Sequence, residues 1–192
     1  MTKKWMTALA AVALFSTNAW AQSMPVYEST GTLEISLGGK PQVFHTTANT
    51  VPNQPGRLVH TARWYVAKPM MLGGINLAPA GRQVELRARP TIEPDSSNKA
   101  EFQFNFALDE DTHAVLDTSR VTVTYSATGS VSPEYEDAES VLEIESAALS
   151  DSGVLTLKGG VAGTLVAASG SSAGNLKPLP YQATFVINAH PK

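Results

Sequence analysis

Residues 100–108 read AEFQFNFAL, and this stretch decides the fold class. Every second residue in it is large and apolar, and the residues between are polar or small. Successive side chains of a β-strand point to opposite faces, so this period of two predicts a half-buried strand. The apolar side of that strand consists of Phe102, Phe104, Phe106 and Leu108.

The same alternation recurs along the chain. It is seen in TLEISL (32–37), RQVELRAR (82–89), VTVTY (121–125) and YQATFVINA (181–189). Gly38-Gly39 and the run from Ser150 to Gly153 separate alternating segments and are typical of hairpin turns, because glycine accepts positive φ angles. We therefore predict an all-β chain of about eight to ten short strands, forming a single antiparallel β-sandwich or a partly open barrel with little or no helix.

The segment EYEDAESVLEIESAAL, residues 134–149, fits two conformations. Residues recur near helical spacing at Ala138, Val141, Leu142, Glu145 and Ala148. The acidic start of the segment also suits a helix N-terminus. The VLEIES part instead alternates, with Leu142 and Ile144 on one side. We favour a loop followed by a strand, with a helix as the alternative.

The first 21 residues have the pattern of a secretory signal peptide. Lys3 and Lys4 form a positive start, an apolar run covers residues 6–15, and Ala19-Trp20-Ala21 matches a small-residue cleavage site. The apolar run is too short to span a bilayer, although an uncleaved anchor is the competing interpretation. We predict one all-β domain over residues 22–192, in the periplasm or secreted, with no membrane-spanning segment after cleavage.

Charge and cysteine content exclude several classes of function. Removing residues 1–21 takes away two lysines and no acid, which leaves 12 basic and 17 acidic side chains and a net charge of −5. Nucleic-acid binding is not expected, because it requires a basic patch. The chain has no cysteine, which excludes disulfides, thiolate metal sites and a cysteine nucleophile.

The most charged stretch is ALDEDTHAVLD, residues 107–117. Its candidate binding residues are Asp109, Asp111 and His113. A calcium loop of the EF-hand type requires Gly at its sixth position and Glu at its twelfth, whereas counting from Asp109 these positions hold Ala114 and Arg120. A looser calcium site of Asp109, Asp111 and Asp117 remains an alternative. We favour a solvated connection between two strands.

No catalytic constellation is predicted. GSSAG, residues 170–174, matches the serine hydrolase motif, but residues 175–180 contain two prolines and cannot begin the helix that this motif requires. No acid follows Asp151, so the triad would be incomplete. A second acidic run contains Glu134, Glu136, Asp137 and Glu139. Glycosidases place paired carboxylates across a cleft, so we interpret this run as a solvated face. We therefore expect a protein that is not an enzyme.

No metal or cofactor is predicted either. The four histidines are His45, His60, His113 and His190. None is spaced from another in the way that compact ligand motifs require. His45 and His60 would approach each other if their strands were neighbours, and Met70 and Met71 could add soft ligands. Nothing in the spacing fixes that arrangement, so periplasmic metal binding is a minor alternative.

Trp64 and Tyr65 complete the candidate binding residues. Side by side on a strand, they point to opposite faces, so one can anchor the core while the other meets a ligand. Trp and Tyr favour sugar stacking and protein interfaces. A core Trp beside a surface Tyr is the simpler interpretation.

These observations favour an exported, non-enzymatic all-β module that binds or assembles with an envelope protein or glycan. One alternative is a pilus or fimbrial subunit that self-assembles by strand addition at a sheet edge, using YQATFVINA and the N-terminal SMPVYESTG (23–31). A second is an envelope polysaccharide hydrolase with Asp109, Asp111, His113 or Glu136 in its site. A third is the periplasmic metal-binding protein.

Overall fold

The structure is a computed structural model that describes most of the chain after residue 25. The described residues are 26–51, 57–68, 70–72, 75–78, 80–93, 98–116, 121–129, 133–137, 139–169 and 176–192. The side chains of residues 70–78 are not among them. The predicted signal peptide, residues 1–21, lies outside the described residues.

All regular secondary structure in the described residues is β, in thirteen strands. The strands are β1 (Tyr27–Leu37), β2 (Lys40–Thr50), β3 (Leu58–His60), β4 (Ala62–Ala67), β5 (Met70–Leu72), β6 (Ile75–Ala78), β7 (Gly81–Ala88), β8 (Glu101–Leu108), β9 (Thr122–Ser126), β10 (Tyr135–Asp137), β11 (Val141–Leu149), β12 (Leu155–Ala167) and β13 (Leu179–Pro191). Among these residues no helix is long and apolar enough to cross a membrane.

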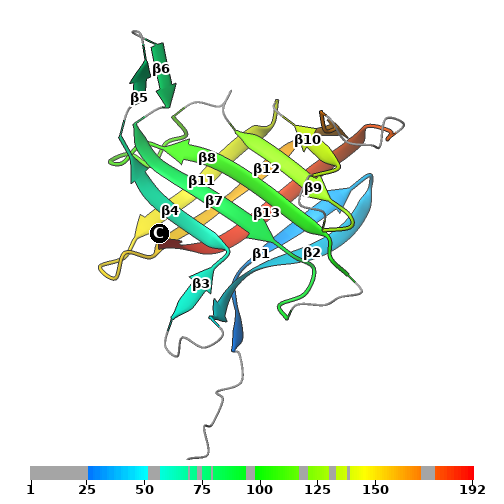
Figure 1. Ribbon diagram of the computed structural model, residues 1–192, viewed down its shortest axis with the longest axis horizontal. Helices are drawn as coiled ribbons and strands as arrows, with labels where there is room; N and C mark the ends of the chain where they lie inside the picture. The colour runs from blue at the N-terminus through cyan, green and yellow to red at the C-terminus, as the bar shows by residue number, and fades with distance from the viewer. Residues whose placement is uncertain are drawn as a thin grey trace, which may run out of the picture.

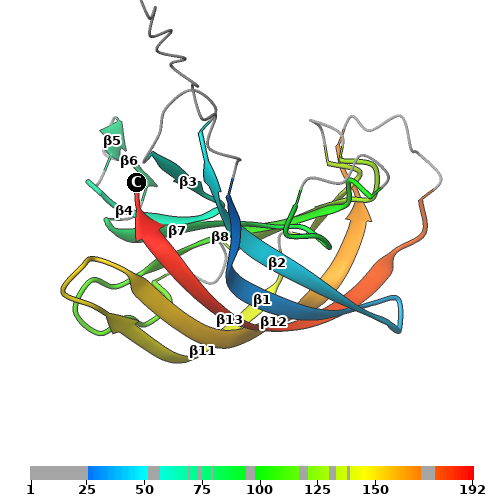
Figure 2. The same cartoon turned by 90° about the horizontal axis from the view of Figure 1, so that it is seen from below.

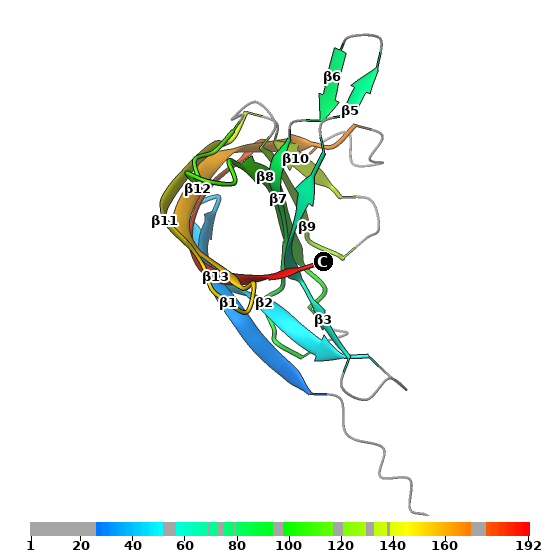
Figure 3. The same cartoon turned by 90° about the vertical axis from the view of Figure 1, so that its left-hand side faces the viewer.

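Eleven of the strands form one sheet that curves back on itself. Its order is β11-β12-β10-β9-β8-β7-β4-β13-β1-β2-β3, and β12 also pairs with β13 along its length. Figure 2 shows β11, β12, β13, β1 and β2 curving beneath β4, β7 and β8, and the end-on view in Figure 3 shows the strands surrounding a common interior. The remaining hairpin, β5–β6, projects away from this body (Figure 1).

Two short strand pairings join the lower strands of the curved sheet to the upper strands and so close the barrel. On one side β10 pairs with the end of β12 through Tyr135 and Glu136. On the other side β13 pairs with β4 through His190↔Arg63 and Pro191↔Trp64, and this is the one parallel pairing among the described strands. The predicted all-β sandwich or partly open barrel is thereby confirmed, and its pairing is antiparallel apart from these two residue pairs.

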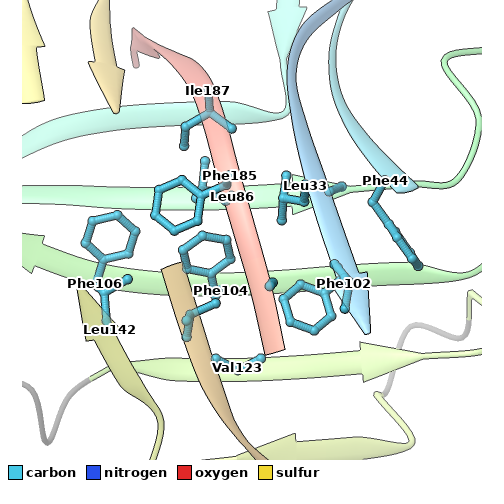
Figure 4. Packing of buried hydrophobic residues seen from close by; sticks show 14 of the residues in the cluster. Leu33, Phe44, Leu86, Phe102, Phe104, Phe106, Val123, Leu142, Phe185 and Ile187 are labelled. Carbon is cyan, nitrogen blue, oxygen red and sulfur yellow. The ribbon is translucent and has the colours of Figure 1, made fainter. Parts of the chain in front are cut away.

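Aromatic side chains fill the interior of the barrel. The predicted apolar side of AEFQFNFAL is buried, with Phe102 and Phe104 fully enclosed. The Phe104 ring lies 5.5 Å from the Phe106 ring and 5.3 Å from the Phe185 ring, measured between centroids, and Figure 4 shows these side chains pointing toward one another from β8 and β13. The alternating residues of β1, β7, β9 and β13 are buried in the same cluster, as their pattern predicts.

The open question about residues 134–149 is answered by two strands. β11 confirms the predicted strand over VLEIES, and the helical alternative is wrong. The loop expected before it instead contains the short strand β10, because Tyr135–Asp137 pair with β9 and the first two of these residues also pair with β12. The strands outnumber the expected eight to ten because β3, β5, β6 and β10 have only three or four residues each. The hairpin turn at Gly38-Gly39 is also confirmed, with φ angles of 56° and 80°.

Candidate functional site

Trp64 and Tyr65 project to opposite sides of β4. Trp64 packs against the buried core, and its indole Nε1 donates a hydrogen bond to the carbonyl of Gly153 at 2.9 Å. Tyr65 lies on the outer face and is half-buried. Of the two aromatic candidates, Tyr65 is therefore the one that can meet an external ligand.

Tyr65 forms one end of a polar groove on the outer face of β4, β7 and β8. We call this the amide groove and define it by Tyr65, Gln83, Glu85, Arg87, Gln103 and Asn105. The strand register brings these residues together, because Tyr65 is opposite Gln83, Glu85 is opposite Asn105 and Arg87 is opposite Gln103. The groove has a volume of about 330 Å³.

Ion pairs hold the Tyr65 end of the groove in place. The Glu85 carboxylate pairs with Arg63 at 3.0 Å and with the Lys192 ammonium at 3.3 Å. The same ammonium lies 4.7 Å from the centroid of the Tyr65 ring. The C-terminal residue is fixed there because its backbone N–H donates to the Trp64 carbonyl at 3.0 Å. This network orients the tyrosine before any ligand binds.

The rest of the groove is lined by amide side chains. Asn105 donates from Nδ2 to the Thr122 hydroxyl at 3.4 Å, and Gln103 donates from Nε2 to Glu101. Each amide offers both donors and acceptors in one plane, which suits a ligand with many hydroxyl groups. An aromatic ring beside such amides adds an apolar contact for the faces of sugar rings.

The acidic loop that follows β8 is a tight turn organised by Asp109. One oxygen of this carboxylate, Oδ1, accepts the backbone N–H groups of Asp111 at 3.1 Å and Thr112 at 2.8 Å, and the Thr112 hydroxyl at 2.8 Å. The hydrogen bonds from Thr112 lower the pKa of the Asp109 carboxyl. His113 follows in the left-handed region with a φ of 57°. Asp109 therefore acts as a structural acceptor within a solvated connection.

The predicted cation and metal residues that the structure describes do not form a ligand cluster. Within the described residues, no group of three or more His, Asp or Glu side chains could hold a metal ion. Asp117 and Ser172, and the side chains of Met70 and Met71, lie outside those residues. β2 and β3 are neighbours as the histidine hypothesis required, but their register places His60 opposite Ala48, and the His60 ring stacks on His190.

Three carboxylates of the second acidic run accept hydrogen bonds from other parts of the chain. Glu134 accepts the Ala127 N–H at 3.0 Å, and Glu136 accepts both the N–H and the hydroxyl of Ser169 at 3.0 Å. Asp137 is buried rather than solvated, and its Oδ2 accepts the Thr164 N–H at 3.0 Å. The interpretation as a solvated face is therefore wrong for Asp137, because this carboxylate points into the barrel wall between β10 and β12.

Two features of the outer surface were not predicted from the sequence, namely a second hollow and the amide side chains of the groove. A second hollow of about 480 Å³ lies on the other side of the barrel, over β1, β2 and β13, and its described lining includes Glu34, Gln42, Val43 and Gln182 but no aromatic side chain. Gln83, Gln103 and Asn105 were visible only as the polar half of their strands. Alternation could have indicated that they share an outer face, but only the strand order brings them beside Tyr65.

Comparison with known proteins gives no match. The chain fits no protein-family model, and neither the curated proteins nor the solved structures contain a significant match to it.

Proposed function

We propose that the chain is an exported, non-enzymatic β-barrel module that binds a cell-envelope glycan through the amide groove. The observation that carries this proposal is the combination of Tyr65 with Gln83, Gln103 and Asn105 along one groove. The signal-peptide pattern of residues 1–21 supports export to the periplasm or beyond. The interior is filled by a buried hydrophobic cluster, which supports recognition of a glycan on the outside of the barrel.

A glycan fits the groove better than an apolar ligand does. Of the groove residues other than Val84, each contributes a hydrogen-bonding side chain, and the ring of Tyr65 is the main apolar surface. Sugars present hydroxyl groups around an apolar ring face, which matches amides and carboxylates beside one aromatic ring. Arg87 and Glu85 add charges of both signs, so the groove favours neither a strongly anionic nor a strongly cationic polymer.

The strand-exchange subunit is less favoured, because residues 181–187 are paired on both edges within the chain and the described residues Tyr27–Gly31 of the N-terminal segment already pair with β2. β13 lies between β12 on one edge and β1 and β4 on the other. β1 is paired on both edges from Gly31 onward, with β2 and β13. Neither strand offers a free edge or an open slot to a second copy over these residues.

The hydrolase is less favoured because its candidate residues are separated and engaged. Asp109 organises the turn after β8, whereas Glu136 lies on β10 and accepts hydrogen bonds from Ser169. Paired carboxylates in glycosidases flank a shared cleft about 5–9 Å apart. The amide groove has one carboxylate, Glu85, and that group is paired with Arg63.

The test is binding of isolated envelope polysaccharide to the purified chain, with a double variant Gln103→Ala/Asn105→Ala. Each lost hydrogen bond removes about 1 kcal/mol, so the double variant should bind about tenfold or more weakly. The matched control, Gln42→Ala/Gln182→Ala, removes two amides from the hollow on the other side of the barrel and should bind as the wild type does. Equal weakening by both pairs, or no binding of any polysaccharide, would contradict the proposal.

A further inference from the structure

Arg82 is an arginine that points into the barrel. It is the second residue of β7 and pairs with Leu108 at the end of β8. Alternation along β7 places it on the interior side with Val84 and Leu86, and only 5% of its surface is exposed. Arginine is rarely buried unless its charge is paired, so this position requires an explanation.

Among the described residues, the charge of Arg82 has an aromatic neighbour but no anionic partner. Its guanidinium carbon lies 4.9 Å from the centroid of the Trp64 ring. Two of its nitrogens, Nε and Nη1, are buried and donate no hydrogen bond. In the described part of the chain no carboxylate forms an ion pair with it, whereas Arg63 pairs with Glu85 and Arg89 pairs with Glu101.

The surroundings show that this end of the barrel is closely packed. Gly81, beside Arg82, has a φ of 126°, and a Cβ there would collide with Cδ1 of Leu116 and lie 2.7 Å from the Leu108 carbonyl oxygen. The turn after β8 folds back over this end, because the Leu116 N–H donates to the Ala107 carbonyl at 2.9 Å. Trp64 is held from the other side by its hydrogen bond to Gly153.

Burying a cation costs free energy because its charge loses water, and each N–H group without an acceptor adds to that cost. A bound anion would supply both the opposite charge and the acceptors. Desolvated charge is compensated by opposite charge, and each unsatisfied buried donor carries its own penalty. Trp64 occupies one face of the guanidinium. The N–H groups point outward in the guanidinium plane, which is the direction from which carboxylates and other oxyanions are recognised.

We propose that Arg82 anchors a small-anion site at this end of the barrel, with Trp64 as its aromatic wall. The ligand class is a carboxylate or another oxyanion small enough to reach the guanidinium edge. The site is separate from the amide groove, because Arg82 faces the interior while Gln83 faces outward from the same strand. Failure of either proposal therefore leaves the other standing.

The test follows the side-chain Nε–H signals of the full chain by NMR after labelling its arginines with nitrogen-15. Sodium acetate and sodium sulfate are added separately at constant ionic strength. The Arg82 signal is expected to shift and to saturate with at least one of the two anions, and the preferred anion distinguishes a planar carboxylate from a tetrahedral oxyanion. The Arg87 signal, from the exposed outer face of the same strand, should show no saturable shift.

Thermal unfolding provides the second measurement. The same anion should raise the melting temperature of the wild type and of Arg87→Met, and should leave that of Arg82→Met unchanged. Arg82→Met is expected to fold, since replacing an unpaired buried charge by an apolar side chain is often neutral or stabilising. Absence of a saturable Arg82 shift with both anions in the wild type would overturn the proposal, as would an equal thermal shift in Arg82→Met.

Discussion

The imidazole rings of His60 and His190 stack face to face, with centroids 3.6 Å apart and 11° between their planes. His60 ends β3 and His190 lies near the end of β13, so the contact joins two segments that do not pair as strands. The Nδ1 atom of His60 is buried without a hydrogen-bond partner. The stack therefore requires at least one neutral ring, because two imidazolium ions at this distance repel.

This stack predicts a loss of stability in mild acid. Burial lowers the pKa of both rings, and the charge of His190 lowers the pKa of His60 further. The unfolded chain, with histidine pKa values of about 6.5, therefore binds protons first as the pH falls. The free energy of unfolding should be level above that pH, decrease below it, and level off beneath the lowered folded values. Urea unfolding at a series of pH values measures this dependence.

A single substitution isolates the contribution of the stack. His190→Gln should flatten the decrease between neutral pH and mild acid, since one titrating ring and its repulsion are gone. Val186→Ala, a change at an exposed position of β13 that carries no titratable group, is the control and should leave the wild-type pH dependence in place. An unchanged slope in His190→Gln would show that other groups cause the acid sensitivity.

The Asp109 carboxylate is expected to order the turn after β8 without a cation. Asp109→Ala removes the acceptor of the Asp111 and Thr112 N–H groups, so these two amides should exchange with deuterium faster than in the wild type. Asp111→Asn should leave their exchange unchanged. Slower exchange on adding calcium, lost in Asp111→Asn, would instead support the calcium site of Asp109, Asp111 and Asp117.

Phe104 is expected to be one of the most costly positions in the core. Phe104→Ala should reduce the free energy of unfolding by about 3–5 kcal/mol, because the ring is fully buried and contacts Phe106 and Phe185. Val186→Ala, on the outer face of β13 with 54% of its surface exposed, should cost less than about 0.5 kcal/mol. A similar loss of unfolding free energy in the two variants would mean that Val186, rather than Phe185, faces the core.

We expect a side chain at position 163 to be excluded by steric contact with neighbouring side chains, and not by the backbone angle of Gly163. A Cβ there would collide with Oδ2 of the buried Asp137 and lie 3.1 Å from the Tyr181 hydroxyl. Gly163→Ala should therefore cost about 1–3 kcal/mol in chemical unfolding. Gly160→Ala is the control, since its nearest contact would be the Ala183 carbonyl at 3.3 Å and its loss should be smaller. Equal losses of unfolding free energy in Gly163→Ala and Gly160→Ala would contradict the placement of Asp137 beside Gly163.

Period-two alternation predicted which side of each strand is buried, but not which strands are neighbours. Phe102, Phe104 and Phe106 lie on one face of β8, because alternate residues of a strand point to the same side, and that apolar face is the buried one. The opposite directions of Trp64 and Tyr65 follow from the same rule. Arg82 also shares the parity of Val84 and Leu86, yet an arginine beside a run of polar residues gives no sign that it is inside.

The candidate site depends on pairings that no local pattern contains. Glu85 meets Asn105 only because β7 and β8 pair in one register, and a shift by one residue would turn the amides inward. Lys192 reaches Tyr65 because β13 ends beside β4 through two parallel residue pairs. Clustered charge is visible in a sequence, which is why the acidic loop was a candidate site, whereas the groove combines Tyr65, three amides and two opposite charges from three separate strands.

The most direct test of the central claim is an NMR titration of the nitrogen-15-labelled chain with fragments of envelope polysaccharide, observing the side-chain amide signals. We predict saturable shifts for Gln83, Gln103 and Asn105, with the signals of Gln42 and Gln182 unchanged. Shifts confined to Gln42 and Gln182 would place binding on the other side of the barrel, over β1, β2 and β13. That result, or the absence of any shift at the amide groove, would contradict the account.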